Sequence, residues 1–293
     1  RIAPWPESSR ERDRELKDMD FFFYVTDGSI FRSVAKMNIL IIQTPLHIPA
    51  YSLANWWKLR TWRHIICYSR FIANIIKGKL GRDAKVLFVP IKKIPPRDFL
   101  KKENTIVSVG RFFPHLHNKK QLEMVDMFAR FVDIGIKGVK LYLVGSVDPG
   151  GEEYFEKVEL KARNLPVWVE SQMSYNQLAE IYKRAKVYWH ATGYGENLEK
   201  FPERAEHFGV TTVEAMSHGV VPVVFGAGGQ AEIVTNGQDG FTWKNEAELL
   251  KYTLMLLTNM ALQERMAYSA FDSALQFTKD TFCERLHEIL EIQ

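Results

Sequence analysis

Short apolar runs alternate along the chain with stretches whose apolar residues recur every three or four positions. The runs predict strands and the stretches predict amphipathic helices. In the first third of the chain we expect strands at FFFYV (21–25) and NILIIQ (38–43), and a helix over 29–36. A further helix begins after Ser69, whose hydroxyl is a typical N-cap. The polar opening stretch, residues 1–18, is typical of an exposed linker or a frayed helix.

From residue 105 onward the alternation becomes regular. Five strands are predicted, namely TIVSVG, KLYLVG, VWVE, VYWHA and VVPVVF, with helices KKQLEMVDMFARFVDIG, GEEYFEKVELKARN, NQLAEIYKRA and TTVEAMSHG between them. Three more helical patterns follow at 245–258, 260–276 and 279–291. This order is typical of an α/β fold with one complete doubly wound domain around a parallel sheet. The segment before it has too few strands to be an equal domain, and the Pro- and Lys-rich run IKKIPPRDFLKKEN marks the boundary.

A composition of 46% hydrophobic and 25% charged residues indicates a folded globular chain. Its longest apolar runs are far shorter than the roughly 20 residues that cross a bilayer, and no signal peptide can be recognised. Cys67 and Cys283 lie in apolar segments far apart, so we expect two reduced core thiols and a cytoplasmic protein. The first residue is Arg1, which suggests that the chain begins inside a longer gene product.

The net charge of +4 is unevenly distributed. Residues 32–102 hold 15 basic side chains and only two acidic ones, so this part favours an anionic partner unless it is simply a solvated basic face. Aromatic and basic residues interleave there: Trp56, Trp57, Trp62 and Tyr68 with Lys58, Arg60, Arg63 and Arg70. Such a mixture can stack on single-stranded nucleic acid or lie at an anionic membrane surface.

The first polar loop at a predicted strand end is VGRFFPHLHNKKQ. Arg111 follows the strand and Lys119 precedes the next helix, so the two cations could clamp a diphosphate. The alternative is a surface ion pair for Arg111 and no role for Lys119. His115 and His117 lie close in sequence, but no carboxylate or Cys cluster completes a metal site, and none is expected.

The second polar loop is PERAEHFGVTTVEAMSHG. Glu206 and Glu214 flank a predicted helix start, where the backbone amides of residues 208–211 would face an anion. Gly209 permits a close approach of the backbone to a ligand. A carboxylate beside a diphosphate is unfavourable, so the two glutamates more plausibly accept hydrogen bonds from sugar and ribose hydroxyls. The alternative is that they cap the helix and carry surface charge.

Two further loops give weaker signals. Gly226, Gly228 and Gly229 form a glycine-rich turn of a kind that many strand-to-helix connections use. His190 ends a strand and precedes a polar loop long enough to be functional. A single histidine in such a position is more often a core residue or a support for another group.

Taken together, these motifs resemble the C-terminal domain of glycosyltransferase family 4. The run GR, the Lys before the next helix, EHFGVTTVEAMSHGVVPVV, GGQAEIV and NGQDGF carry the resemblance. Members of this family are retaining enzymes of the two-domain GT-B fold. The resemblance implies a metal-independent glycosyltransferase, without a cofactor, that moves a sugar from a UDP- or GDP-linked donor to a hydroxyl of a glycan or lipid-linked acceptor. The EHFG and GG motifs give a slight indication of GDP-mannose.

The resemblance also implies roles for individual residues. Arg111 and Lys119 would hold the diphosphate, and Glu206 would face the transferred sugar; these three are the expected catalytic residues. Glu214 would bind the ribose hydroxyls. The other expected donor-binding residues are Gly110, Met173 in the base pocket, and Phe208, Gly209, Val210 and Thr211 at the helix start.

On this basis we expect a partial N-terminal acceptor-side domain at 1–98, a donor-binding domain at 99–277 and a final helix at 278–293 that returns to the N-terminal domain. The family's opening strand and glycine-rich loop have no counterpart here, so the first half of that domain would be absent. A sugar-contacting His common in the family is replaced by Gln43, with His47 further on. The alternative is therefore a nucleotide-sugar binding module that is inactive alone. We favour a peripheral site at the inner face of an anionic membrane over nucleic acid.

Overall fold

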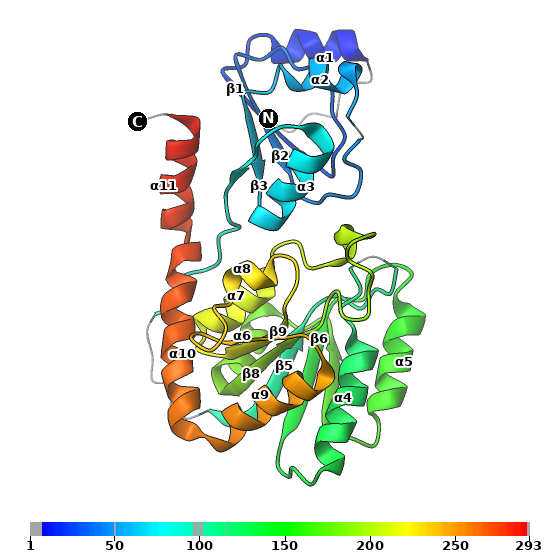
Figure 1. Ribbon diagram of the computed structural model, residues 1–293, viewed down its shortest axis with the longest axis vertical. Coiled ribbons are helices and arrows are strands. Elements are labelled where there is room, and N and C mark those ends of the chain that lie inside the picture. The colour runs from blue at the N-terminus through cyan, green and yellow to red at the C-terminus, as the bar shows by residue number, and fades with distance from the viewer. Residues whose placement is uncertain (1–7, 50, 96–98, 100–101, 116, 292–293) are drawn as a thin grey trace. The chain divides into compact units, whose positions relative to one another are not determined.

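The computed structural model describes residues 8–49, 51–95, 99, 102–115 and 117–291, and the chain divides into two compact units. Residues 1–89 and 282–293 form the first unit, and residues 90–281 form the second. The sequence pattern places these divisions at 98/99 and 277/278. Each unit has α/β structure with a parallel sheet (Figure 1), so the predicted fold class is confirmed.

The first unit contains a four-stranded parallel sheet in the order β1-β2-β3-β4. Its elements are α1 (Ser9–Leu16), β1 (Phe21–Thr26), β2 (Met37–Ile42), α2 (Leu53–Leu59), β3 (His64–Cys67), α3 (Arg70–Leu80), β4 (Lys85–Val86) and the end of α11 (Lys279–Leu290). The Ser69 hydroxyl accepts the amide of Ile72 and caps α3, as predicted. Ile289 and Leu290 of α11 pack on Ile39 of β2 in a core cluster.

The helix predicted over 29–36 is wrong. These residues, all of which the structure describes, contain no helical turn. Their backbone groups bond to distant partners instead: the Trp62 indole donates to the Phe31 carbonyl at 2.8 Å, and the Ser33 amide donates to the Thr61 hydroxyl at 3.1 Å. Tertiary hydrogen bonds have replaced the local ones that a helix would need.

Two other predictions for the first unit need correction. Trp62 is only 1% exposed and packs among Phe22, Tyr24 and Phe31, so it cannot belong to a stacking surface. Cys283, on α11, is partly exposed, unlike the buried Cys67. Both cysteines are free, as predicted. Of the opening stretch, residues 9–16 are helical and 1–7 lie outside the described residues.

The second unit contains a six-stranded parallel sheet in the order β10-β9-β8-β5-β6-β7. Its strands are β5 (Glu103–Val109), β6 (Lys140–Gly145), β7 (Val167–Ser171), β8 (Ala185–His190), β9 (Val221–Phe225) and β10 (Phe241–Trp243). Its helices are α4 (Gln121–Asp133), α5 (Glu152–Ala162), α6 (Tyr175–Arg184), the 3-10 turn η1 (Pro202–Arg204), α7 (Val210–Ser217), α8 (Gln230–Ile233), α9 (Glu246–Thr258), α10 (Met260–Ala274) and the 3-10 turn η2 (Leu275–Phe277).

The strand order reverses direction at β5, which places helices on both faces of this sheet. The chain moves from β5 to β6 and β7 through α4 and α5, then jumps back to β8 through α6. Because such crossovers are right-handed, α4 and α5 cover one face, while α6 and α7 cover the other. The carboxyl ends of β5 and β8 are neighbours at this reversal, where α/β sheets form their binding crevice.

The strands predicted from the sequence match every strand that the structure describes in the second unit except β10. That strand has three residues and pairs with β9 alone, so it is too short to produce an alternating pattern. The helices predicted at 245–258, 260–276 and 279–291 are confirmed as α9, α10 and α11, which are long enough for their periodicity to be recognised.

Candidate active site

The loop after β5 brings Lys119 back over the end of that strand. The side-chain amide of Gln121, the first residue of α4, donates to the Gly110 and Arg111 carbonyls at 3.0 and 3.1 Å and closes the loop. A Cβ atom on Gly110 would come within 2.6 Å of the Lys119 Cγ. The Lys119 stem therefore lies directly against Gly110, and a side chain at this position would force the lysine to move.

Lys119 forms an ion pair with Glu206, whose segment leads from β8 into α7. The Lys119 Nζ and Glu206 Oε2 atoms are 2.5 Å apart, and the two side chains are only 15% and 12% exposed. Burial disfavours ionised Glu206, but the Lys119 charge and the bonds from His190 and Lys119 outweigh it, so the pKa of Glu206 lies well below its usual value. The structure thus brings together two of the three predicted catalytic side chains.

His190 completes this cluster from the last position of β8. Its Nε2 atom lies 2.9 Å from Glu206 Oε2. Burial and the Lys119 charge lower the pKa of His190, against the opposing effect of Glu206. A neutral ring that donates from Nε2 leaves Nδ1 as an acceptor, and Nδ1 is buried without a hydrogen-bond partner in the described part of the chain. The sequence favoured a core or supporting role for His190 over a functional one, and the contact with Glu206 is a supporting one.

Arg111, the third predicted catalytic residue, has a different partner. Its Nη1 atom donates to Asp148 Oδ2 at 3.1 Å, and its guanidinium lies 5.7 Å from the centre of the Phe113 ring. The pair is partly exposed, so a ligand with more negative charge can compete for the guanidinium. Asp148, in the loop after β6, was not identified from the sequence because an isolated acidic loop residue gives no signal.

The predicted helix start is confirmed at α7, with Gly209 as its N-cap at φ 111°. The first amides of a helix have no partner within the helix and attract anions. Thr211 is fixed at this end because its hydroxyl donates to the Val109 carbonyl of β5 at 3.2 Å and lies 2.7 Å from the Tyr188 hydroxyl. The Phe208 side chain is buried against Phe277, so only its backbone can face a ligand.

The glycine-rich turn that gave a weak signal supports this segment. The Gly229 amide donates to the Glu206 carbonyl at 2.7 Å. A Cβ atom on Gly229 would come within 2.6 Å of the Phe208 backbone, and one on Gly228 within 2.2 Å of the Glu206 carbonyl oxygen. The two glycines therefore let the 226–229 turn lie flat against the backbone that carries Glu206.

Glu214 and Met173 lie around α6 and α7. Glu214 is one turn into α7, and burial raises its pKa. Its carboxylate also helps to raise the pKa of Tyr175, after the larger effect of that residue's own burial. Met173 precedes Tyr175 by two residues and is partly exposed. This group is thus separate in the chain from the Lys119 loop.

Three further side chains lie in the loops that carry Lys119 and Glu206: His117, which the sequence raised only as a metal ligand, and His207 and Glu196, which it did not single out. The rings of His117 and His207 meet edge to face with centres 3.9 Å apart, and burial is the main reason that the pKa of His117 falls to about 3 and that of His207 to about 4. Glu196, in the long polar loop after β8, accepts from Lys120 at 2.7 Å and from Arg204 at 2.8 Å. Only the length and polarity of that loop could have indicated it.

His115 and His117 do not form part of a metal-binding group. Among the described residues, no three His, Cys, Asp or Glu side chains come together in a way that could hold a metal ion. The same part of the chain contains no helix both long and apolar enough to cross a bilayer.

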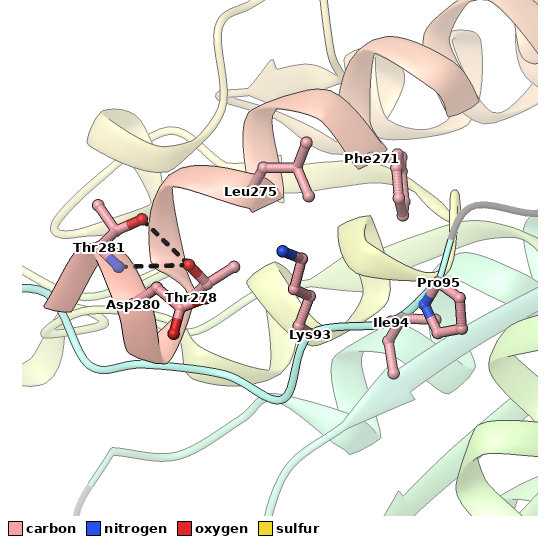
Figure 2. A pocket seen from close by; sticks show the side chains of 8 residues that line it. All are labelled: Lys93, Ile94, Pro95, Phe271, Leu275, Thr278, Asp280 and Thr281. Carbon is pink, nitrogen blue, oxygen red and sulfur yellow. Dashed lines mark hydrogen bonds between the residues drawn. The ribbon is translucent and has the colours of Figure 1, made fainter. Parts of the chain in front are cut away.

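A separate cavity of about 700 Å³ lies between the segment after β4 and the end of α10 (Figure 2). It is lined by Lys93, Ile94, Pro95, Phe271, Leu275, Thr278, Asp280 and Thr281. The Thr278 hydroxyl accepts the Thr281 amide at 3.4 Å and lies 3.0 Å from the Thr281 hydroxyl, as the dashed lines show. None of the predicted site residues lines this cavity.

Comparison with known proteins yields a family match and relatives of known fold. Residues 91–272 match the family described as glycosyl transferases group 1. The chain is similar to GDP-Man:Man(3)GlcNAc(2)-PP-Dol alpha-1,2-mannosyltransferases from Dictyostelium discoideum (27% identity, 72% of this chain and 43% of that protein) and Neurospora crassa (28%, 68% and 35%). It therefore spans less than half the length of these curated relatives.

Solved structures with a similar fold include TarM (TM-score 0.74, 14% identity, 96% of this chain and 57% of that one). Others are sucrose-phosphate synthase from Thermosynechococcus elongatus (0.68, 16%, 88% and 68%) and HepE from Anabaena in complex with UDP and glucose (0.67, 19%, 87% and 72%). These neighbours are GT-B glycosyltransferases, and the GT-B fold predicted for the chain is confirmed.

Proposed function

Because the chain belongs to the family of group 1 glycosyl transferases, we propose that it moves a sugar from a nucleotide diphosphate donor to a hydroxyl of a glycan or lipid-linked acceptor. The observation that carries the proposal is the buried Lys119–Glu206–His190 cluster at the neighbouring ends of β5 and β8. It supplies a cation, a carboxylate held ionised and a neutral imidazole next to the start of α7.

In this proposal, Lys119 and Arg111 hold the donor diphosphate and stabilise the charge that develops as it leaves. The amides of residues 208–211 add the positive end of α7. When the diphosphate binds, the Lys119 ammonium interacts with a phosphate oxygen as well as with Glu206. The Arg111 guanidinium likewise interacts with a phosphate oxygen in place of part of its contact with Asp148. Glu206, still fixed by His190, then accepts hydrogen bonds from hydroxyls of the transferred sugar.

We propose a retaining reaction of the family 4 type. The bond from the anomeric carbon to the diphosphate oxygen breaks while the acceptor oxygen bonds to the same face of that carbon. The acceptor proton passes to the departing phosphate oxygen, so no side-chain base is required. The two cations and the helix amides provide the charge stabilisation that a divalent metal would otherwise supply, and we therefore propose that neither metal nor cofactor takes part.

The nucleoside end of the donor is assigned to the group around α6 and α7. Glu214 accepts hydrogen bonds from the ribose, and Met173 lies against the base. The names of both curated relatives include GDP-Man and a PP-Dol acceptor, which supports GDP-mannose as the first donor and a lipid-linked glycan as the first acceptor to test. UDP-linked donors are the alternative.

A lipid-linked acceptor favours contact with an anionic membrane, and α2 supports it. Leu53 and Trp57 are 72% and 64% exposed, and the Arg60 guanidinium lies 4.9 Å from the Trp56 ring centre and 5.5 Å from that of Trp57. Exposed apolar and basic side chains on one short helix are typical of a membrane-interface segment. We favour this surface over nucleic acid because Trp62 is withdrawn into the core.

The deciding experiment is calorimetric titration with UDP and with GDP, in EDTA and again with added Mg²⁺. Micromolar binding of one nucleotide, equal in both buffers, is the expected result. Binding that appears only with Mg²⁺ would contradict the metal-independent reaction. Failure of both nucleotides to bind would contradict the donor site itself.

The alternative, a nucleotide-sugar binding module that is inactive alone, is motivated by the small first sheet and by Gln43 and His47. The His47 Nδ1 atom lies 2.7 Å from Asp27 Oδ2 on an exposed surface. Transfer of labelled sugar by this chain would rule the alternative out. Nucleotide binding without transfer, together with transfer by a longer form of the protein, would establish it.

A further inference from the structure

A polar pocket of about 240 Å³ lies beside the candidate active site, between the loop before α4 and the long loop after β8. Its lining residues are Pro114, His115, His117, Asn118, Glu196 and Arg204. None of them was among the predicted donor-binding residues. The volume is below the roughly 300–1,000 Å³ of sites for drug-sized ligands, so it suits a single ring better than a whole nucleotide.

The walls of this pocket are fixed before any ligand arrives. Glu196 holds the two loops together, because its Oε1 atom accepts from Lys120 and its Oε2 atom from Arg204. The Asn118 Oδ1 atom accepts the Lys120 amide at 2.7 Å and the Tyr154 hydroxyl at 3.2 Å. With its oxygen engaged, Asn118 has its Nδ2 donors left for a ligand. Such preorganised polar groups are what specific binding needs.

The charges of the pocket suit hydroxyl groups better than an anion. Glu196 balances the cations on either side of it, and their hydrogen bonds lower its pKa, so it stays ionised. His117 adds no charge near neutral pH because burial lowers its pKa to about 3. The result is a mixture of donors (Asn118, Arg204) and acceptors (Glu196), which is what a sugar ring with several hydroxyls requires.

The position of the pocket distinguishes it from the donor site. His117 lies in its wall, and its ring meets that of His207, the residue after Glu206, with centres 3.9 Å apart. Met173 and Glu214, assigned to the nucleoside, come instead from the segments around α6 and α7. A ligand in the pocket would therefore lie on the side of the Lys119–Glu206 pair, where the transferred sugar is assigned.

We propose that this pocket binds one sugar ring of the acceptor glycan, with Asn118, Glu196 and Arg204 as the residues that recognise its hydroxyls. The inference rests on the proposed transferase function and adds an acceptor subsite built from the same unit that binds the donor. It makes these three residues determinants of acceptor specificity.

The test compares Asn118→Asp and Arg204→Lys with the unaltered chain. Asn118→Asp keeps the acceptor that fixes the loop and removes the free donors, while Arg204→Lys keeps the charge beside Glu196 and removes the planar fork. Arg130→Lys is the matched control, because Arg130 pairs with Glu246 on α9, outside the pocket. Binding of mannotriose, maltotriose and chitotriose is measured by saturation-transfer NMR, and binding of GDP and UDP by calorimetry.

We expect at least one trisaccharide to bind, at least tenfold more weakly to both pocket variants and within twofold for Arg130→Lys. Nucleotide affinity should stay within twofold in all three variants. Unchanged trisaccharide binding in the pocket variants, or loss of nucleotide binding in its place, would overturn the inference. A chain that binds nucleotide but none of the trisaccharides would also overturn it. A chain that binds no nucleotide contradicts the proposed function instead, and the trisaccharide result still decides the pocket.

Discussion

The Glu206 carboxylate contacts the Lys119 ammonium and the neutral His190 imidazole. All three side chains are largely buried, so both contacts affect the stability of the fold. Without Lys119, burial is the main influence on the pKa of Glu206 and raises it. A buried carboxylate without its partner is strongly unfavourable, typically by about 3 kcal/mol or more. A substitution that disturbs the Glu206 carboxylate should therefore lower both the stability of the fold and the proposed transferase activity.

We predict that Lys119→Met and Glu206→Gln each lower turnover by about 100-fold, the usual effect of losing a group that stabilises the transition state. In the unaltered chain the depressed pKa of Glu206 adds stability above its unfolded value of 4.5, and this is lost as pH falls further. The free energy of unfolding of Lys119→Met should be lowest relative to the unaltered chain at pH 7, and the difference should become smaller toward pH 4. Urea unfolding across that range measures it, and full activity in both variants would refute the assignment.

Glu214 should show the opposite relation between stability and pH. Burial raises its pKa, so its contribution to stability is largest when it is protonated and is lost as pH rises through the folded pKa. We predict that Glu214→Gln unfolds at a higher urea concentration at pH 7 and binds nucleotide several-fold more weakly. Tighter or unchanged nucleotide binding in this variant would remove Glu214 from the ribose site.

The His117–His207 contact should make the protein sensitive to acid. In the folded chain the pKa of His117 is about 3 and that of His207 about 4, so both rings stay neutral down to those pH values. In the unfolded chain the two imidazoles take up protons below about pH 6.5. Stability should therefore fall as pH drops from 6.5 toward 4. His117→Phe keeps an aromatic ring and should flatten this part of the pH profile in thermal unfolding. An equally steep profile would show that other groups cause it.

At the scale of elements, the 226–229 turn and the segment before α7 form one packed unit. A Cβ atom on Gly229 has no room against the Phe208 backbone. We predict that Gly229→Ala costs about 1–3 kcal/mol of stability and weakens nucleotide binding at least tenfold, because the start of α7 must shift. Gly78→Ala, in open space on α3, is the control and should stabilise by up to about 1 kcal/mol. Equal nucleotide affinity in both variants would contradict this.

Sequence patterns predict helices and strands well where the local preference of a segment agrees with the contacts it makes to distant residues. The Ser69 cap and the long helices α9 to α11 are of this kind. The segment 29–36 fails because its backbone bonds to Thr61 and Trp62, about 30 residues away. The motif match brings Lys119 and Glu206 into one site. It does not predict His207 or Glu196, because their contacts depend on how two loops meet.

At the scale of the whole molecule, the first unit carries the excess of basic over acidic side chains, 16 against 11, and side chains of α2 are exposed there. We predict sedimentation with liposomes containing phosphatidylserine but weaker binding to neutral ones, and about tenfold loss in Trp57→Ala, because an interfacial ring is removed. Trp168→Ala, at an exposed tryptophan of the second unit, should leave binding unchanged. If the chain binds a single-stranded oligonucleotide as strongly as the liposomes, and Trp57→Ala loses that binding too, the nucleic-acid hypothesis would be favoured.

The ion pair at the centre of the candidate site joins residues 87 positions apart. Lys119 follows β5 and Glu206 follows β8, and these two strands are neighbours in the sheet although β6, β7 and their helices lie between them in the sequence. Such long-range pairing forms slowly and late. The candidate site therefore forms only when β5 and β8 lie side by side, so a chain in which β8 has not yet docked lacks the Lys119–Glu206 pair.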